Sequence, residues 1–176
     1  MDRYVHHELR SVYTALAALA VGLAVTGGVR GAPMTAYGAG KFALGLVAFT
    51  VVSTLLGATR LKWVGEIRDF EAAVPLAAPP ADGVGLRRHP LNWWLFTVMS
   101  VPTFVLAIAW EPWIALLPLW PALAWLGQAW LAVDWERRNG RVLWRGLDSD
   151  APWKLAYSVG EPGGAGAGAP TRTTSA

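Results

Sequence analysis

Four long apolar runs, separated by short polar segments, dominate the pattern of this chain. They cover residues 12–29, 42–58, 93–110 and 113–133, and none of them contains Asp, Glu, Lys or Arg. At about 1.5 Å per residue, helices of this length match the ~30 Å hydrocarbon core of a bilayer. Four such runs leave too little polar sequence to cover them in a water-soluble fold. The pattern therefore predicts an all-α integral membrane protein with four transmembrane helices, arranged as two hairpins.

The polar segments between the runs predict the orientation of the chain. With four spans, both termini and the loop 59–92 lie on one side, and the loops 30–41 and 111–112 lie on the other. Of the 15 Lys and Arg residues, only Arg30 and Lys41 fall in the latter loops, which leaves 13 with the termini. Basic residues concentrate on the cytoplasmic side of membrane proteins. We therefore expect both termini in the cytoplasm, and the abundance of Ala, Gly, Arg and Trp favours a bacterial cytoplasmic membrane.

A cleaved signal peptide is the competing interpretation of the first run, because the charged stretch MDRYVHHELR precedes it. Signal peptides carry a shorter apolar segment of about 7 to 15 residues and small residues before the cleavage site. Here the run is longer and Arg30 follows it, so we expect the first run to remain as a span.

Aromatic and basic residues at the ends of the runs are expected to lie at the membrane surface. The stretch WLAVDWERRNGR, residues 130–141, marks the cytoplasmic end of the fourth run. On a continuing helix, Asp134 can pair with Arg137 and Arg138 at spacings of three and four residues. The expected interfacial anchors are Trp63, Trp93, Trp94, Trp110, Trp113, Trp135, Arg137 and Arg138.

Two segments outside the runs have patterns of their own. Residues 60–74 place Trp63, Ile67, Phe70 and Val74 at helical spacing, which predicts a short cytoplasmic helix that could extend the second span as far as Pro75. Residues 160–176 are rich in Gly, Ala, Pro and Thr, and they are predicted to form a disordered cytoplasmic tail after a membrane domain covering 1–159.

Small residues recur every four positions in the first run, at Thr14, Ala18, Gly22 and Thr26, and a weaker pair follows in the second run at Ser53 and Gly57. Such stripes let two helix backbones approach closely. The stripe predicts either a seam between two copies of the chain or packing of the first two helices within one copy, and we favour the second interpretation.

The amino-acid composition excludes several kinds of functional site. Only 15% of the residues are charged, against 54% that are hydrophobic, and there is no cysteine, which excludes disulfides, thiolate nucleophiles and iron–sulfur clusters. No ionisable residue lies within a run, which counts against a proton-coupled exporter. Gln128 is the strongest polar side chain inside a run and is suited to an interhelical hydrogen bond. No cofactor is predicted, and because the basic residues follow the run ends, no nucleic-acid partner is expected.

The candidates for catalysis or metal binding gather on the predicted cytoplasmic side. His89, Asp134 and Glu136 are candidate catalytic residues, and His6, His7 and Glu8 are candidate metal ligands, because imidazoles and carboxylates exchange protons and ligate metals. Their spacing matches no hydrolase, metalloprotease or nucleotide-binding motif. We expect them to be solvated interfacial residues.

The second hairpin, from His89 to Arg138, resembles the bacterial two-transmembrane (2TM) domain in its short aromatic turn, its Trp120-Pro121 pair and its Trp-Glu-Arg-Arg ending at 135–138. This resemblance implies a helical hairpin and no chemistry. Our leading hypothesis is a small membrane protein that acts by contact with other membrane proteins, with a second copy and with lipids, including anionic headgroups. The alternatives are a membrane enzyme that takes a lipophilic substrate at the cytoplasmic interface, and a small transporter component.

Overall fold

A computed structural model describes residues 2–31, 38–61, 65–76, 91–146 and 154–159, and it is mostly helical. Three segments are long and apolar enough to span a membrane: α1 (Tyr4–Arg30), α2 (Ala39–Gly57) and the segment Pro112–Asn139. The last of these consists of a 3-10 turn, η2 (Pro112–Leu116), followed by α5 (Leu119–Asn139). Helix α4 (Trp93–Ala109) is also apolar but has only 17 residues.

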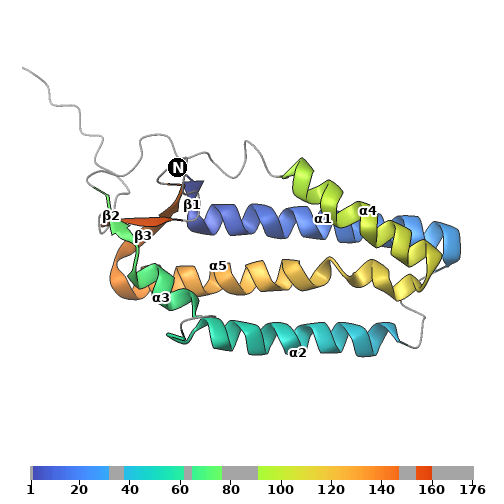
Figure 1. Ribbon diagram of the computed structural model, residues 1–176, viewed down its shortest axis with the longest axis horizontal. Coiled ribbons are helices and arrows are strands. Elements are labelled where there is room, and N and C mark those ends of the chain that lie inside the picture. The colour runs from blue at the N-terminus through green and yellow to red at the C-terminus, as the bar shows by residue number, and fades with distance from the viewer. Residues whose placement is uncertain (1, 32–37, 62–64, 77–90, 147–153, 160–176) are drawn as a thin grey trace, which may run out of the picture.

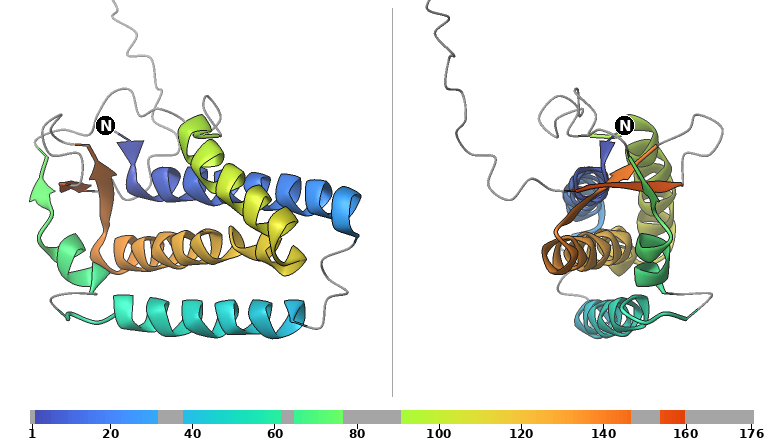
Figure 2. Two further views of the ribbon diagram at one scale, coloured as in Figure 1. Left: turned by 45° about the vertical axis from the view of Figure 1, so that its right-hand side comes forward. Right: turned by 90° about the vertical axis from the view of Figure 1, so that its left-hand side faces the viewer.

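The long helices lie side by side in a row, except for one helix that crosses the row. Helix α5 lies between α1 and α2, and α4 crosses α1 obliquely (Figures 1 and 2). Helix α1 therefore packs against α4 and α5, and α2 packs against α5. The expected packing of the first span against the second is wrong, because α5 separates them.

The chain breaks after the second span. Helix α2 ends at Gly57, and a separate short helix, α3 (Glu66–Glu71), follows. The short helix after the second span is thus present, but it does not continue that span. Gly65 permits the break, because a Cβ at this position would overlap the backbone at Thr59 and Leu61.

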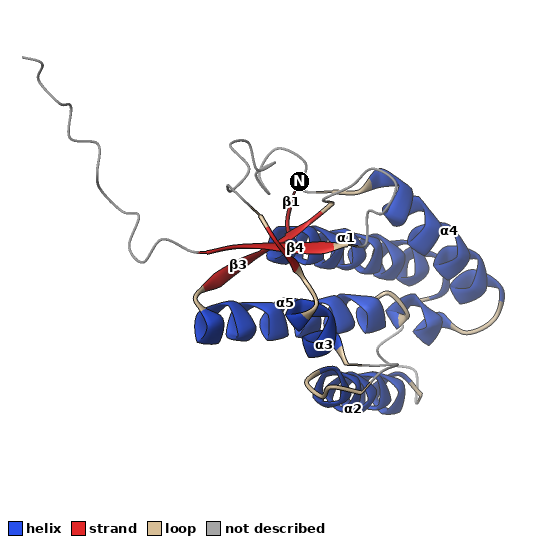
Figure 3. Cartoon of the chain, turned by 60° about the vertical axis from the view of Figure 1, so that its left-hand side comes forward, coloured by secondary structure: helices blue, strands red, loops and turns tan. Residues whose placement is uncertain are grey.

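Four short strands correct the all-α prediction. β1 (Asp2–Arg3), β2 (Val74–Pro75), β3 (Arg141–Arg145) and β4 (Leu155–Val159) form one sheet in the order β1-β3-β4-β2. β3 pairs with β1 and β4 in antiparallel fashion, whereas β2 and β4 are parallel. Gly140 ends α5 in a left-handed conformation with φ of 60°, which lets the chain turn into β3. Figure 3 shows the strands gathered at one end of the helices.

We call the sheet, α3 and the adjoining ends of α1 and α5 the cap. The cap has its own apolar core, in which Tyr4 packs on Phe70 at 5.4 Å and Phe70 on Trp135 at 6.0 Å between ring centroids. Leu143 of β3 closes this core and is fully buried. Trp135, which we expected at the membrane surface, is thus buried in the core of the cap.

The helices beyond the cap have the opposite character. Large apolar side chains are exposed along α2 and α4, among them Leu44, Val51 and Leu55 on α2 and Val101 and Val105 on α4. A surface of this kind and extent is typical of helices that lipid covers.

Candidate ligand-binding site between the helices and the cap

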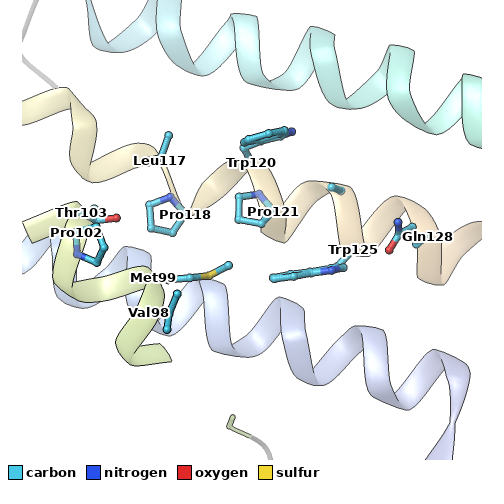
Figure 4. A pocket seen from close by; sticks show the side chains of 11 residues that line it. Val98, Met99, Pro102, Thr103, Leu117, Pro118, Trp120, Pro121, Trp125 and Gln128 are labelled. Atoms are coloured by element: carbon cyan, nitrogen blue, oxygen red, sulfur yellow. The ribbon is translucent and has the colours of Figure 1, made fainter. Parts of the chain in front are cut away.

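An apolar groove of about 450 Å³ lies between α4 and α5, both of which pack on α1. Figure 4 shows Met99 and Pro102 of α4 on one side of this groove and Pro121 and Trp125 of α5 on the other. Gln128 lies at the end of the groove nearer the cap. The complete lining is Val98, Met99, Pro102, Thr103, Leu117, Pro118, Trp120, Pro121, Ala124, Trp125 and Gln128. We call this cavity the α4–α5 groove.

The small-residue stripe of α1 positions one wall of the groove. Thr14, Ala18, Gly22 and Thr26 are all buried. A Cβ at Gly22 would lie 3.6 Å from the Phe104 ring and 3.8 Å from the Thr103 methyl group, so α4 is seated on this stripe within the same chain. The Thr14 hydroxyl accepts a hydrogen bond of 3.0 Å from the Asn92 backbone, directly before α4 begins.

The weaker small-residue pair of α2 faces α5 and α3. Ser53 is half-buried, and a Cβ at Gly57 would lie 3.3 Å from Leu131 and 3.5 Å from Glu66. Small residues on α2 and α5 thus bring these two helices together beside the cap.

A second cavity, of about 620 Å³, lies where the helices meet the cap, and we call it the junction pocket. Charged and apolar side chains share its lining, which comes from α1, α3, α5 and the sheet. The residues are Tyr4, Glu8, Glu66, Asp69, Ala72, Val74, Trp125, Gln128, Arg145, Lys154 and Leu155. Trp125 and Gln128 line both the junction pocket and the α4–α5 groove, so the two cavities adjoin.

Two carboxylates of the junction pocket differ in their partners. Glu8 is only 2% exposed, and its carboxylate accepts a hydrogen bond of 3.0 Å from the Arg145 guanidinium. Glu66 accepts a hydrogen bond of 2.9 Å from the Gln128 amide. Within the described residues, no cationic group lies at ion-pair distance from Glu66 or Asp69.

The surroundings of Glu66 disfavour its charged form. Burial, and secondarily the charge of Asp69, raises the pKa of the Glu66 carboxyl above its ordinary value. The hydrogen bond from Gln128 and the positive charge of Arg145 act in the opposite direction and are the smaller causes. Glu66 is therefore a carboxylate that a cation entering the pocket would stabilise.

The candidate catalytic residues do not converge in the described part of the chain. Glu136 is buried, accepts a 2.7 Å hydrogen bond from Arg3 and a 2.8 Å bond from the Leu143 amide, and so ties α5 to β1 and β3. Asp134 pairs with Arg138 at 2.9 Å on the outer face of α5. His89 lies outside the described residues.

The candidate metal ligands His6, His7 and Glu8 lie in the first turns of α1. No group of three His, Asp or Glu side chains that could hold a metal ion occurs among the residues that the structure describes. Glu8 is instead the partner of Arg145.

The remaining expected anchors have mixed environments. Trp93, Trp94 and Trp110 are exposed at the two ends of α4. The Trp113 ring packs on the Phe42 ring, with the two centroids 4.5 Å apart. Arg137 is exposed, and Trp63 lies outside the described residues. The Trp120 ring lies 5.6 Å from the Phe49 ring, measured between centroids, although 42% of Trp120 remains exposed.

Sequence reasoning missed most of the junction pocket. It singled out Gln128 as a polar residue seeking an interhelical partner, but it did not identify Glu66 as that partner. The spacing of Glu66 and Asp69, three residues apart in a predicted short helix, was the available signal that both would share one helix face. Arg145 and Lys154 belong to no motif or periodic pattern of the sequence and gave no signal.

No family model, no curated protein and no solved structure matches this chain. The resemblance of the second hairpin to the 2TM domain therefore carries no argument about function.

Proposed function

We propose that this chain is a four-span protein of the bacterial cytoplasmic membrane, with both termini and the cap in the cytoplasm. The three long apolar segments, the exposed apolar faces of α2 and α4, and the distribution of Lys and Arg support this proposal. Helix α4 reaches about 25 Å, and exposed tryptophans at both of its ends suit a span that lies at the membrane surfaces.

The absence of native cysteine gives a clean test of this topology. Glu111 lies in the exposed turn after α4, and Val159 is an exposed residue at the end of β4. In intact cells, an impermeant maleimide should label Glu111→Cys and spare Val159→Cys, and permeabilised cells should label both. Labelling of Val159→Cys in intact cells would overturn the orientation.

We further propose that the protein binds a lipophilic, amphipathic molecule, with the apolar part in the α4–α5 groove and the polar part in the junction pocket. The observation that carries this proposal is the double role of Trp125 and Gln128, which line both cavities. Ligand sites of a few hundred cubic ångströms combine an apolar lining with a few polar groups that fix orientation. Here the apolar groove adjoins a pocket that contains the charged groups, so one site offers contacts for both parts of an amphiphile.

The same site would serve an enzyme that acts on a lipophilic substrate, but the contacts favour binding. Glu8, Asp134 and Glu136 each form an ion pair with an arginine of the chain. In the part of the chain that the structure describes, no nucleophile or general base is aligned with another reactive group across the groove.

A lipid probe with a diazirine in its acyl chain tests the binding proposal. After illumination in nanodiscs, crosslinks should concentrate in the peptides that contain residues 98–103 and 117–128. Val98→Trp fills the edge of the groove and should reduce this labelling about fivefold or more. Val105→Trp is the matched control, because Val105 is also exposed on α4 but does not line the groove. Equal labelling in both variants, or crosslinks spread evenly over the exposed faces of α2 and α4, would refute the proposal.

Action through contact with another membrane protein, or with a second copy, is the second candidate. The observation that favours it is α2, which packs mainly on α5 and exposes Leu44, Val51 and Leu55. A photoreactive residue at position 44 should then capture a protein partner in native membranes, whereas capture of lipid alone would exclude this face as the contact.

A further inference from the structure

The junction pocket contains more charged groups than an apolar ligand needs. Three acids and two bases line it: Glu8, Glu66, Asp69, Arg145 and Lys154. One acid and one base neutralise each other, because Glu8 and Arg145 form a buried ion pair at 3.0 Å. The groups that remain for a ligand are Glu66 and Asp69 on α3, with Lys154 at the start of β4.

The two acids of α3 both line the pocket, and Glu66 is half-buried whereas Asp69 is exposed. They are three residues apart on a helix, so their side chains share a face. Among the described residues, the Glu66 carboxylate accepts a hydrogen bond from the Gln128 amide alone, and its pKa is raised by burial and by the charge of Asp69. An anionic head would add repulsion to these acids, whereas a cationic head would reduce the repulsion between the two carboxylates.

We infer that the junction pocket selects an amphiphile whose polar head carries an ammonium group, with Glu66 and Asp69 as its charge partners. This inference rests on the proposed binding function. Tyr4 and Trp125 also line the pocket, and aromatic rings attract cations that reach their faces. Lys154 lies on the side of the sheet and is exposed, so it accommodates a phosphate attached to the same head.

Two sources provide this chemistry: an aminophospholipid, in which the ammonium follows a phosphodiester, and a simple long-chain amine. Both are tested with the same photoreactive acyl chain. One probe has an ethanolamine phosphate head, one has a glycerol phosphate head, and one is a long-chain primary amine. The measured quantity is the yield of crosslinks to residues 98–103 and 117–128 in nanodiscs of uniform lipid.

The ethanolamine probe is expected to label the groove about fivefold more than the glycerol probe, since a partly hydrated ion pair contributes about 1 kcal/mol. The double variant Glu66→Gln, Asp69→Asn should abolish this preference, because it lowers labelling by the ethanolamine probe and removes the repulsion that limits labelling by the anionic glycerol probe. Glu71→Gln is the matched control, because Glu71 also lies on α3 but pairs with Arg60 outside the pocket. The amine probe identifies the source: labelling equal to the ethanolamine probe indicates the ammonium alone, and weaker labelling indicates a phosphate contribution.

The outcomes separate this inference from the proposal beneath it. If no probe labels the groove, the binding proposal fails. If the ethanolamine and glycerol probes label it equally, or if the double variant keeps the preference, the groove binds lipid but the head-group inference is wrong. A Tm of the double variant no lower than that of the unaltered protein, measured without probe, shows that the loss of preference does not come from unfolding.

Discussion

Glu136 and Asp134 are two acids on the same turn of α5, and the structure predicts opposite consequences for their removal. The Glu136 carboxylate is 7% exposed and accepts hydrogen bonds from Arg3 and from the Leu143 backbone. The Asp134 carboxylate is 36% exposed and, among the described residues, pairs only with Arg138, which is itself 76% exposed. The comparison therefore tests whether the cap is held by buried polar contacts.

The expected loss of stability in each variant depends on which polar groups the substitution leaves without a partner. Glu136→Ala removes the acceptor of the Leu143 amide in a buried environment, which costs about 1 to 3 kcal/mol. The lost pair with Arg3 adds at most about 1 kcal/mol, because the Arg3 side chain is 39% exposed and water replaces its partner. We expect a total of about 2 to 3 kcal/mol. Asp134→Ala should cost under about 0.5 kcal/mol, as is usual for an exposed pair four residues apart.

Hydrogen exchange of β3 measures this difference directly. In detergent or nanodiscs, a loss of 2 to 3 kcal/mol should speed exchange of the Leu143 amide by roughly 30- to 150-fold if exchange occurs through opening of the cap. Glu136→Gln retains a carbonyl oxygen for the Leu143 amide and should recover most of the protection. Equal exchange in the Glu136→Ala and Asp134→Ala proteins would refute the role assigned to Glu136.

Three further predictions concern the packing of the helices and the junction pocket. Gly127→Ala places a methyl group onto the Thr54 hydroxyl and should lower the free energy of unfolding by about 1 to 3 kcal/mol. In Gly45→Ala the new methyl group meets no neighbour, so this control variant should be neutral or stabilising. Titration with a denaturing detergent measures the unfolding free energy of both variants. Arg30 donates hydrogen bonds of 2.8 and 2.9 Å to the last carbonyls of α4, so Arg30→Gln should lower the unfolding free energy by about 0.5 to 1 kcal/mol, and an unchanged detergent midpoint would contradict this. Because the pKa of Glu66 is raised in the folded state, the native protein binds this proton more tightly than the unfolded chain, and the contribution of Glu66 to stability falls as pH rises from its unfolded to its folded pKa. Glu66→Gln should therefore raise Tm at pH 8 and have little effect at pH 4, and a variant that melts earlier at pH 8 would reverse this assignment.

The apolar segments were predictable because a membrane span is a local property of the sequence. Residues 12–29, 42–58, 93–110 and 113–133 were recognised from length and composition, and helices cover most of each run. The cap was not predictable in the same way. Its strands have two to five residues, and pairs such as Asp2 with Arg145 join opposite ends of the chain. Short strands with such distant partners leave no periodic signal strong enough to stand out beside four apolar runs.

The packing stripe shows where local reasoning ends. The spacing of Thr14, Ala18, Gly22 and Thr26 correctly indicates a face that another backbone can approach, but spacing does not identify the approaching element. The first two helices were the obvious pair because they are adjacent in sequence. The structure instead places α4 on the stripe, and α5 between α1 and α2. The junction pocket could not be predicted for the same reason, because its walls come from four segments that are distant in sequence.

The buried ion pairs of the cap also indicate how deep in the membrane the proposed site would lie. Glu8 pairs with Arg145 and Arg3 pairs with Glu136, and in each pair the carboxylate is almost fully buried. Such charges are costly in hydrocarbon, so in the proposed orientation the membrane boundary passes between the cap and the α4–α5 groove. The groove then lies at the depth of acyl chains and the junction pocket at the depth of headgroups. The acyl chain of an amphiphile in the adjoining leaflet would then lie level with the groove, and its head would lie level with the junction pocket. Glu66, at the boundary, would be the first charged group of the chain that this head encounters.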